Sequence, residues 1–401
     1  MLPKINFHIT CFFLLLTGLT GHAQKITGKV VSQTDKQALA FANVFLNNTQ
    51  KGATTDENGN FEIKDLPPGN YELIASYIGY ETLAQTIQLT ETGLEVNIEL
   101  SPKSIELQEV VIREDKNWKY NYETFVRGFI GQTPNSSKCK ITNPDILRII
   151  FDPDSALLKV TSRDFLIIEN QALGYRIKYL LEDFSLYYHY NYQTYWGFTL
   201  FEEMKPKNRR EAEKWHKKRL EAFLGSTQHF MKAVFYQNYE SEGFEVRKLR
   251  RILNPDRQPE TTIRNAIKSL HNPGFVMNSD TMNYWMKESG KPKILEILNP
   301  HILPPDSIVL KTDSLTQLQF TDYLHIVYKK EKEAIEYLQQ NRGNIAKRGP
   351  QTSLIYLTQP YVHIEENGIL SNPLALFVEG YWGWKEKVAE MLPFDYMEDA
   401  P

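Results

Sequence analysis

A regular alternation of apolar and polar residues, broken by turn residues at short intervals, constrains the front of this chain more than any other feature. Between residues 94 and 100 apolar and polar side chains alternate, as a strand with one buried face requires. Residues 71–78 are apolar enough on both sides for a central strand. Asn58-Gly59 predicts a type I′ hairpin turn, and residues 67–70 predict the next reversal. Short strands separated by turns about every 8 to 12 residues predict a small β-sandwich over residues 24–112.

The same segment carries a set of motifs whose spacing agrees with these turns. They are Gly28-Lys29-Val30, Ala42-Asn43-Val44, Thr55-Asp56, Gly59-Asn60-Phe61, Leu66-Pro67-Pro68-Gly69-Asn70-Tyr71 and Ser76-Tyr77-Ile78-Gly79-Tyr80. Together they resemble the carboxypeptidase regulatory-like domain, a transthyretin-like Greek-key β-sandwich. In families that carry it, this module is not catalytic and accompanies peptidases, sugar-binding proteins and outer-membrane receptors of the Bacteroidota type. The resemblance therefore implies a structural or recognition role in a cell envelope.

The first 23 residues have the three-part form of a secretory signal. One cation, Lys4, precedes an apolar stretch at residues 9–19, and small residues follow at Gly21 and Ala23. A membrane anchor would need about 20 apolar residues, more than this stretch supplies. We expect cleavage after Ala23 and export to the periplasm, the outer membrane or the cell surface. We expect no transmembrane helix after cleavage, and peripheral association with the outer membrane stays open.

Composition excludes several classes of protein. The 401 residues carry 46 Lys plus Arg against 49 Asp plus Glu, a net charge of -3, whereas general nucleic-acid binders are strongly basic. Of the two cysteines, Cys11 lies in the predicted signal, so the exported chain would hold a single thiol and no intramolecular disulfide. The flanking lysines could activate Cys139, but a structural thiol is the more common outcome.

The remainder, residues 113–401, predicts an α+β domain of unknown function. Strands are expected at 146–151, 157–160, 165–168, 175–181 and 186–198. An apolar stripe between residues 203 and 239 predicts either one long helix or two helices broken at Gly225-Ser226. Further helices are expected at 330–340 and 384–392.

No catalytic motif stands out in this region. His363 and Glu366 have the spacing of a zinc pair, but no histidine follows them, and alternation on a strand would turn them to opposite sides. The sequence therefore supports no catalytic residue, no metal and no cofactor. A triad assembled in space needs no signature, so a peptidase or glycan-directed hydrolase with catalytic residues in 113–401 remains the alternative.

Aromatic residues provide the candidate ligand-binding side chains. On a continuous strand Tyr188, Tyr190 and Tyr192 would project together, with Trp196 further along, and flat amphipathic rings of this kind stack on sugars or line a peptide groove. Trp382 and Trp384, alternating around Gly383, form a second candidate pair. The competing interpretation is that these rings pack a sheet against the long helix.

The sequence thus predicts a non-catalytic envelope protein that binds a glycan or an envelope protein partner. Its ligand-binding residues would be Tyr188, Tyr190, Trp196, Trp382 and Trp384.

Overall fold

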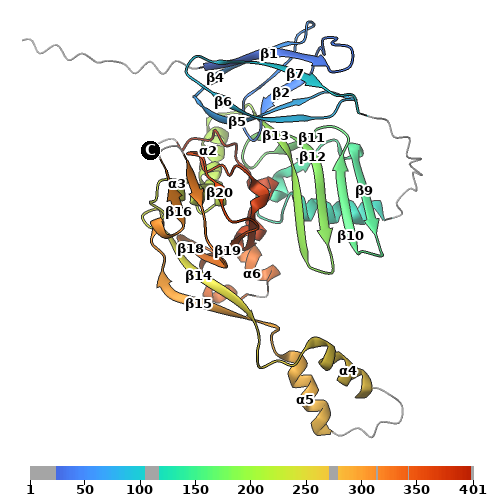
Figure 1. Cartoon of the computed structure of the whole chain (residues 1–401), viewed down its shortest axis with the longest axis vertical. Helices are drawn as coiled ribbons and strands as arrows, with labels where there is room; N and C mark the ends of the chain where they lie inside the picture. Colours follow the sequence, from blue (N-terminus) through green and yellow to red (C-terminus); the bar gives the residue numbers. More distant parts are fainter. Residues whose placement is uncertain (1–23, 104–116, 271–278, 313–314, 342, 399–401) are drawn as a thin grey trace, which may run out of the picture. The chain divides into compact units, whose positions relative to one another are not determined.

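The computed structural model describes residues 24–103, 117–270, 279–312, 315–341 and 343–398, which form two compact units (Figure 1). The first unit comprises residues 24–47 and 51–103, and the second comprises the other described residues. The predicted signal at 1–23 and the predicted domain boundary at 112/113 lie outside the described residues.

The first unit is a sandwich of a three-stranded sheet, β4-β1-β7, and a four-stranded sheet, β3-β2-β5-β6. Strand β1 pairs antiparallel with β4 and parallel with β7. The strands are β1 (Gln24–Ser32), β2 (Asn43–Leu46), β3 (Gly52–Thr54), β4 (Asn60–Leu66), β5 (Gly69–Ser76), β6 (Leu83–Leu89) and β7 (Leu94–Leu100). The all-β sandwich predicted for this segment is confirmed.

Alternation along the strands builds the core of this sandwich. Ile26 and Val30 of β1 pack in one apolar cluster with Val44 of β2 and Leu73 of β5, so the two sheets share their buried faces. Gly28 lies between Ile26 and Val30, and a Cβ there would stand 1.8 Å from the carbonyl oxygen of Val96. Only glycine allows β7 to approach β1 this closely.

The turn before β4 differs from the predicted type I′ geometry. Gly59 has φ +80°, but Asn58 is not among the residues with positive φ, as a type I′ turn would require. The Asp56 carboxylate instead accepts hydrogen bonds from the backbone N–H groups of Asn58 (2.9 Å) and Asn60 (2.8 Å). These hydrogen bonds to the Asp56 side chain stabilise the turn, which therefore needs only one residue in the left-handed region.

The second unit begins with a six-stranded sheet whose longest strands are β12 (Tyr175–Tyr187) and β13 (Tyr192–Glu203). Strand β12 pairs with β13 along one edge and with β11 and β10 along the other, and β8 and β9 complete the sheet. The remaining strands are β8 (Cys139–Ile141), β9 (Leu147–Asp152), β10 (Leu157–Ser162) and β11 (Leu166–Asn170).

One expectation for this sheet is wrong, and one pair of alternatives for the helices that follow it is decided. The strand expected at 186–198 is wrong, because β12 and β13 form a hairpin that reverses at residues 188–191, with Asn191 at φ +51°. The long helical pattern divides into α2 (Arg209–Phe223) and α3 (Thr227–Phe235), as one of the two alternatives predicted. Gly225 adopts φ +69° at the break, and the Ser226 hydroxyl caps α3 by accepting the backbone N–H of His229.

Helix α1 (Trp118–Phe129) packs on the six-stranded sheet. Phe125 and Phe129 are fully buried against Tyr179 and Phe184 of β12, with ring centroids 4.9 to 5.0 Å apart in edge-on contact. Helix α1 therefore covers one face of this sheet. Because successive side chains of a strand point to opposite faces, the residues in between project from the other face.

The second sheet of this unit has the order β15-β14-β18-β19-β21. Its strands are β14 (Phe244–Leu253), β15 (Ile294–Ile302), β18 (Tyr323–Lys332), β19 (Pro350–Leu357) and β21 (Leu376–Gly380). A smaller sheet contains β16 (Val309–Lys311), β17 (Thr316–Leu318) and β20 (Val362–His363). The core between α3 and these sheets includes Phe230, Ile326 and Trp382.

The predicted helices near the end of the chain are shorter than expected. Helix α6 spans only Ile335–Gln340, because the preceding residues up to Lys332 belong to β18. Helix α7 (Tyr381–Lys385) and a 3-10 turn at Val388–Glu390 replace the helix expected at 384–392. The α+β class predicted for the second unit is confirmed by this mixture of sheets and helices.

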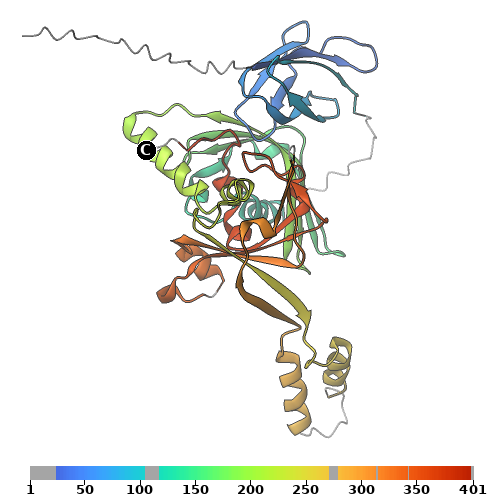
Figure 2. The same ribbon diagram turned by 60° about the vertical axis from the view of Figure 1, so that its left-hand side comes forward.

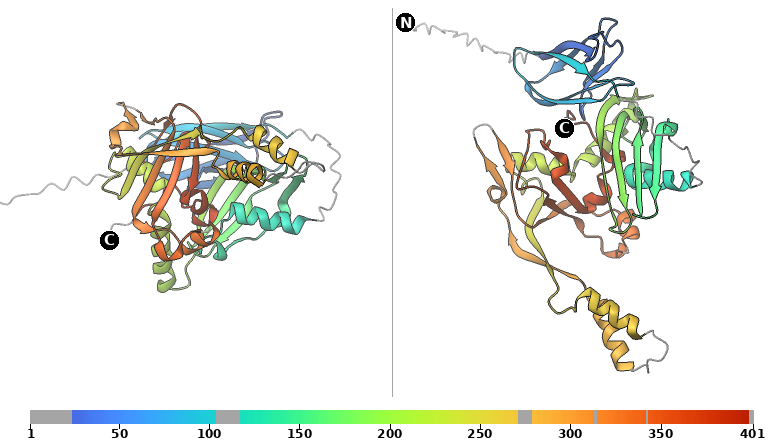
Figure 3. Two further views of the ribbon diagram at one scale, coloured as in Figure 1. Left: turned by 90° about the horizontal axis from the view of Figure 1, so that it is seen from below. Right: turned by 45° about the vertical axis from the view of Figure 1, so that its right-hand side comes forward.

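A helical hairpin, α4 (Glu260–Leu270) and α5 (Ser279–Gly290), extends from the far end of the β14–β15 ribbon (Figures 2 and 3). Across the described ranges, no helix combines the length and apolar character that crossing a membrane would demand.

Candidate ligand surface

Side chains from five strands form a continuous row of aromatic rings on the second unit. The ring centroids of Tyr323 and Tyr356 are 5.1 Å apart, those of Tyr356 and Phe377 are 5.0 Å apart, and those of Phe377 and Tyr192 are 6.0 Å apart. Tyr192 then stacks on Tyr187 at 4.6 Å and contacts Tyr190 at 6.3 Å. We call these six residues, Tyr187, Tyr190, Tyr192, Tyr323, Tyr356 and Phe377, the aromatic row.

Strand register explains why residues so distant in sequence meet here. Tyr356 of β19 pairs directly with Phe377 of β21, and the pairing of Leu324 with Ile355 sets Tyr323 beside Tyr356. Paired residues point to the same face, so these rings share one face of the sheet. Leu324 and Ile355 point to the opposite face and are buried in the core. The row therefore runs across the strands, and neighbouring rings in it are about as far apart as neighbouring strands.

The rings of the row are accessible to a ligand. Tyr192 is 36% exposed and Tyr190 is 76% exposed, while Tyr323, Tyr356 and Phe377 are half-buried. Burial raises the pKa of the Tyr356 hydroxyl, so this group stays protonated and can donate a hydrogen bond at neutral pH. Each ring thus packs against its neighbours in the row and is still at least partly exposed.

One end of the row carries charged side chains. The Arg251 guanidinium lies 4.4 Å above the Tyr323 ring centroid, which is cation–π distance. It donates two hydrogen bonds to the Glu379 carboxylate (2.9 and 2.7 Å) and a third, from Nε, to Glu296 (2.9 Å). The bonds to Glu379 raise the pKa of Arg251, so it stays charged. This end of the row is therefore held rigidly.

Two of the predicted ligand-binding residues lie at or near the aromatic row. Tyr190 is one of its members, at the tip of the β12–β13 hairpin. Trp196 is 42% exposed on β13 and, by alternation, projects from the same face as Tyr192. Tyr188 lies apart from the row, because it occupies the hairpin turn and packs edge-on against Phe151 at 5.8 Å. The expectation that Tyr188, Tyr190 and Tyr192 project together from one strand is therefore wrong.

The tryptophans near the end of the chain lie elsewhere. Trp382 is only 2% exposed, and its Nε1 donates a 2.7 Å hydrogen bond to the carbonyl of Gly225, so its ring is a core side chain in this structure. Trp384 packs against Tyr337 and Tyr381 and donates to the side chain of Gln340. Both residues belong to α7, where side chains two residues apart point in different directions, so they do not form the paired surface that their alternation around Gly383 suggested.

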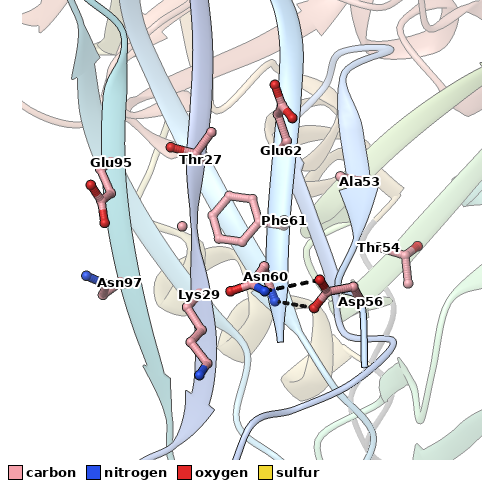
Figure 4. Close-up of a pocket in the computed structure, with 11 residues that line it drawn as sticks. Thr27, Lys29, Ala53, Thr54, Asp56, Asn60, Phe61, Glu62, Glu95 and Asn97 are labelled. Carbon is pink, nitrogen blue, oxygen red and sulfur yellow. Dashed lines mark hydrogen bonds between the residues drawn. The ribbon is translucent and has the colours of Figure 1, made fainter. Parts of the chain in front are cut away.

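The first unit carries a shallow hollow of about 720 Å³ on its three-stranded sheet (Figure 4). Thr27, Lys29, Glu95 and Asn97 line it from β1 and β7. The Phe61 ring also lines the hollow but is only 5% exposed, so it offers little of its face for stacking. The hollow offers polar and apolar surface in equal parts, and with no well-exposed ring it fits an aromatic-stacking ligand less well than the row does.

The histidine with the clearest charged partner is structural. His229 lies in the core, where its Nδ1 accepts the N–H of Gly225 (3.1 Å) and its Nε2 is 3.3 Å from the Glu242 carboxylate. Burial lowers the pKa of His229 to about 4, so the ring is neutral at pH 7. Both ring nitrogens are engaged, which leaves neither for proton transfer to a substrate.

Cys139 has the properties of an inert thiol. Burial, with a smaller contribution from the nearby Glu390 carboxylate, raises its pKa to about 12. The lysines on either side in sequence do not overcome this effect. Across the described segments, no group of three or more His, Cys, Asp or Glu side chains is arranged to hold a metal ion.

The fold and this surface define a β-rich protein of two units, a transthyretin-like sandwich followed by an α+β unit with an exposed aromatic row. Residues 26–112 match the family model of the CarboxypepD_reg-like domain, which confirms the resemblance seen in the sequence.

One characterised relative is TonB-dependent receptor P3 of Formosa agariphila, 34% identical over 104 residues. The match covers 25% of this chain and 10% of the receptor, so the chain spans about a tenth of that relative. Solved structures with likeness include a cohesin–X-dockerin complex of Acetivibrio cellulolyticus, at 26% identity over 20% of this chain and 58% of that one, with a TM-score of 0.18. Another is the pilus 2b backbone protein of group B streptococcus, at 20% identity over 20% and 41%, also with a TM-score of 0.18.

Proposed function

We propose that this protein is a non-catalytic, exported cell-envelope protein whose second unit binds a glycan along the aromatic row. Under this proposal residues 1–23 are a signal peptide, residues 24–112 an accessory sandwich and residues 113–401 the binding domain. The CarboxypepD_reg-like domain and the similarity to a TonB-dependent receptor fit an envelope protein. Export itself rests on the form of the first 23 residues.

The observation that carries the binding role is the geometry of the row. Successive centroids from Tyr323 through Phe377 to Tyr192 lie 5.0 to 6.0 Å apart, so aromatic side chains recur along an extended path. Sugar rings have apolar faces and hydroxyl edges, and the row offers aromatic surface with carboxylates at one end. A linear glycan could therefore make the same kind of contact several times. Trp196 would extend the surface along β13.

The alternative, a hydrolase with catalytic residues in 113–401, would have to use groups other than His229 and Cys139. The first has both ring nitrogens engaged in the core, and the second is held as a neutral thiol. A protein partner is the other occupant for such a row, since Tyr and Arg are enriched at the centres of protein interfaces. The binding experiment distinguishes these outcomes.

The proposal is tested by titrating the exported form, expected to begin at Gln24, with a panel of oligosaccharides in a calorimeter. We compare the wild type with Tyr190→Ala and Tyr192→Ala. Loss of each stacking ring should weaken binding by about 1 kcal/mol, or about fivefold. Both residues are exposed, so the free energy of unfolding should change little.

Tyr361→Ala is the matched control, because Tyr361 is 45% exposed and contacts His363 away from the row. It should bind like the wild type. Equal losses in all three variants, or no binding of any oligosaccharide by the wild type, would rule out the row as a glycan site. Turnover of the oligosaccharides during the titration would instead support the hydrolase.

A further inference from the structure

The charged end of the aromatic row presents carboxylate oxygens, not cationic groups, to a ligand. Arg251 directs Nε toward Glu296 and both terminal nitrogens toward Glu379, and one face of its guanidinium lies on Tyr323. The positive charge of Arg251 is therefore paired with carboxylates of the protein. The side chain of Glu296 is 50% exposed and that of Glu379 is 32% exposed, against 23% for Arg251.

The cluster of charged side chains in contact with this end of the row is negative. One guanidinium faces two carboxylates, so the cluster of Arg251, Glu296 and Glu379 carries an excess of one negative charge. Further along the same face, Arg247 and Lys329 both pair with Glu245, and this second cluster carries one positive charge. His325, also on this face, has a lowered pKa because of burial and the nearby Arg247, so it is neutral at pH 7.

We infer that Glu296 and Glu379 contact the ligand at the end of the aromatic row and select neutral, hydroxyl-rich glycans over polyuronates and other anionic glycans. The inference rests on the proposed function and adds the substrate class. Carboxylates fixed at the rim of a ring surface accept hydrogen bonds from sugar hydroxyls. A ligand carboxylate at the same position has no proton to donate and is repelled. Arg251 is a positioning residue, because it holds both acceptors in place.

The experiment measures two dissociation constants, one for neutral hexasaccharides and one for hexagalacturonate, at low and high salt. The wild type should bind at least one neutral oligosaccharide about three- to tenfold more tightly than hexagalacturonate at low salt. The preference should shrink at high salt, because ions screen charges at an exposed site. A purely structural role for these carboxylates would give no such salt dependence.

Glu296→Gln tests the residue directly. It keeps one acceptor oxygen and the size of the side chain, and Glu379 still holds Arg251 through two hydrogen bonds. Affinity for hexagalacturonate should rise about threefold or more, while affinity for the neutral ligand stays nearly constant. Glu213→Gln is the matched control, because Glu213 is an exposed carboxylate on α2 that pairs with Arg209. It should leave both constants unchanged.

The outcomes separate this inference from the proposed function. If the wild type binds neither kind of oligosaccharide, the proposed glycan-binding role fails. If it binds hexagalacturonate as tightly as neutral ligands at low salt, the role stands and the selectivity assigned to the carboxylates is wrong. Parallel changes in both constants in Glu296→Gln would equally overturn the selectivity.

Discussion

Replacing Glu386 by glutamine should change how the stability of the second unit depends on pH. Glu386 follows α7, and its Oε1 is shielded from solvent without a hydrogen-bond partner in the described structure. Burial raises the pKa of this carboxyl to about 7, and the nearby Lys385 cation and the Thr227 backbone N–H only partly oppose the effect. The folded protein therefore holds a proton on Glu386 that the unfolded chain releases.

The sign and size of this pH dependence of stability follow from the shift in the pKa of Glu386. The ordinary value is 4.5 and the folded value about 7, so folding takes up a proton between these limits. Stability from this group is present below pH 4.5 and is lost as the pH rises to 7. A difference of about 2.5 between the folded and unfolded pKa values corresponds to about 3 kcal/mol in the free energy of unfolding. Near pH 4 Glu386 is protonated and resembles glutamine, so the wild type and Glu386→Gln should be similarly stable. Between pH 4 and 7.5 the free energy of unfolding of the wild type should fall by about 3 kcal/mol relative to that of Glu386→Gln.

Denaturant unfolding followed by tryptophan fluorescence measures this difference, because all six tryptophans lie in the second unit. His229 titrates with the opposite sign, since its pKa is lowered to about 4, but it is present in both proteins and cancels. Glu213→Gln, at an exposed position, is the control and should show no such trend. A constant difference between Glu386→Gln and the wild type across this pH range would refute the reasoning.

Two further predictions concern packing and reactivity. Gly174 has φ +72°, and a Cβ there would stand 2.3 Å from the Trp215 ring, so Gly174→Ala should lower the free energy of unfolding by about 2 to 4 kcal/mol. Gly349→Ala, with no atom within 4 Å of the added Cβ, should be nearly neutral in the same denaturation assay. Native Cys139 should react with a thiol reagent at pH 8 orders of magnitude more slowly than in the denatured chain, because its pKa is about 12. Equal rates in the two states would contradict the pKa shift.

Local patterns predicted much of the architecture. Alternation and turn residues identified the sandwich, because a strand with one buried face imposes its period on the sequence. The break at Gly225 was one of two alternatives, and the positive φ of that residue decided between them. The helix expected from Lys330 failed because pairing with β19 holds residues up to Lys332 in a strand. Strand pairing of this kind depends on residues far away in the sequence.

The candidate site was only partly predictable. The density of tyrosines around Tyr190 indicated the right stretch of chain, including Tyr192, but predicted one continuous strand where the structure has a hairpin. Tyr323, Tyr356 and Phe377 gave no signal, because none of them lies in a stretch dense in aromatic residues. A search for aromatic residues at alternating positions of neighbouring strands could have found them, but only with the strand order already known.

The sequence by itself determined the class of the first unit, the signal-like form of the first 23 residues and the single cysteine in the rest of the chain. Each of these depends on residues close together along the chain or on a simple count. Only the tertiary structure decided which aromatic rings meet, that Trp382 is in the core, and that Arg251 is enclosed by Glu296 and Glu379. These features depend on register and burial, which arise when strands distant in sequence, such as β14 and β18, pair and exclude water from one face.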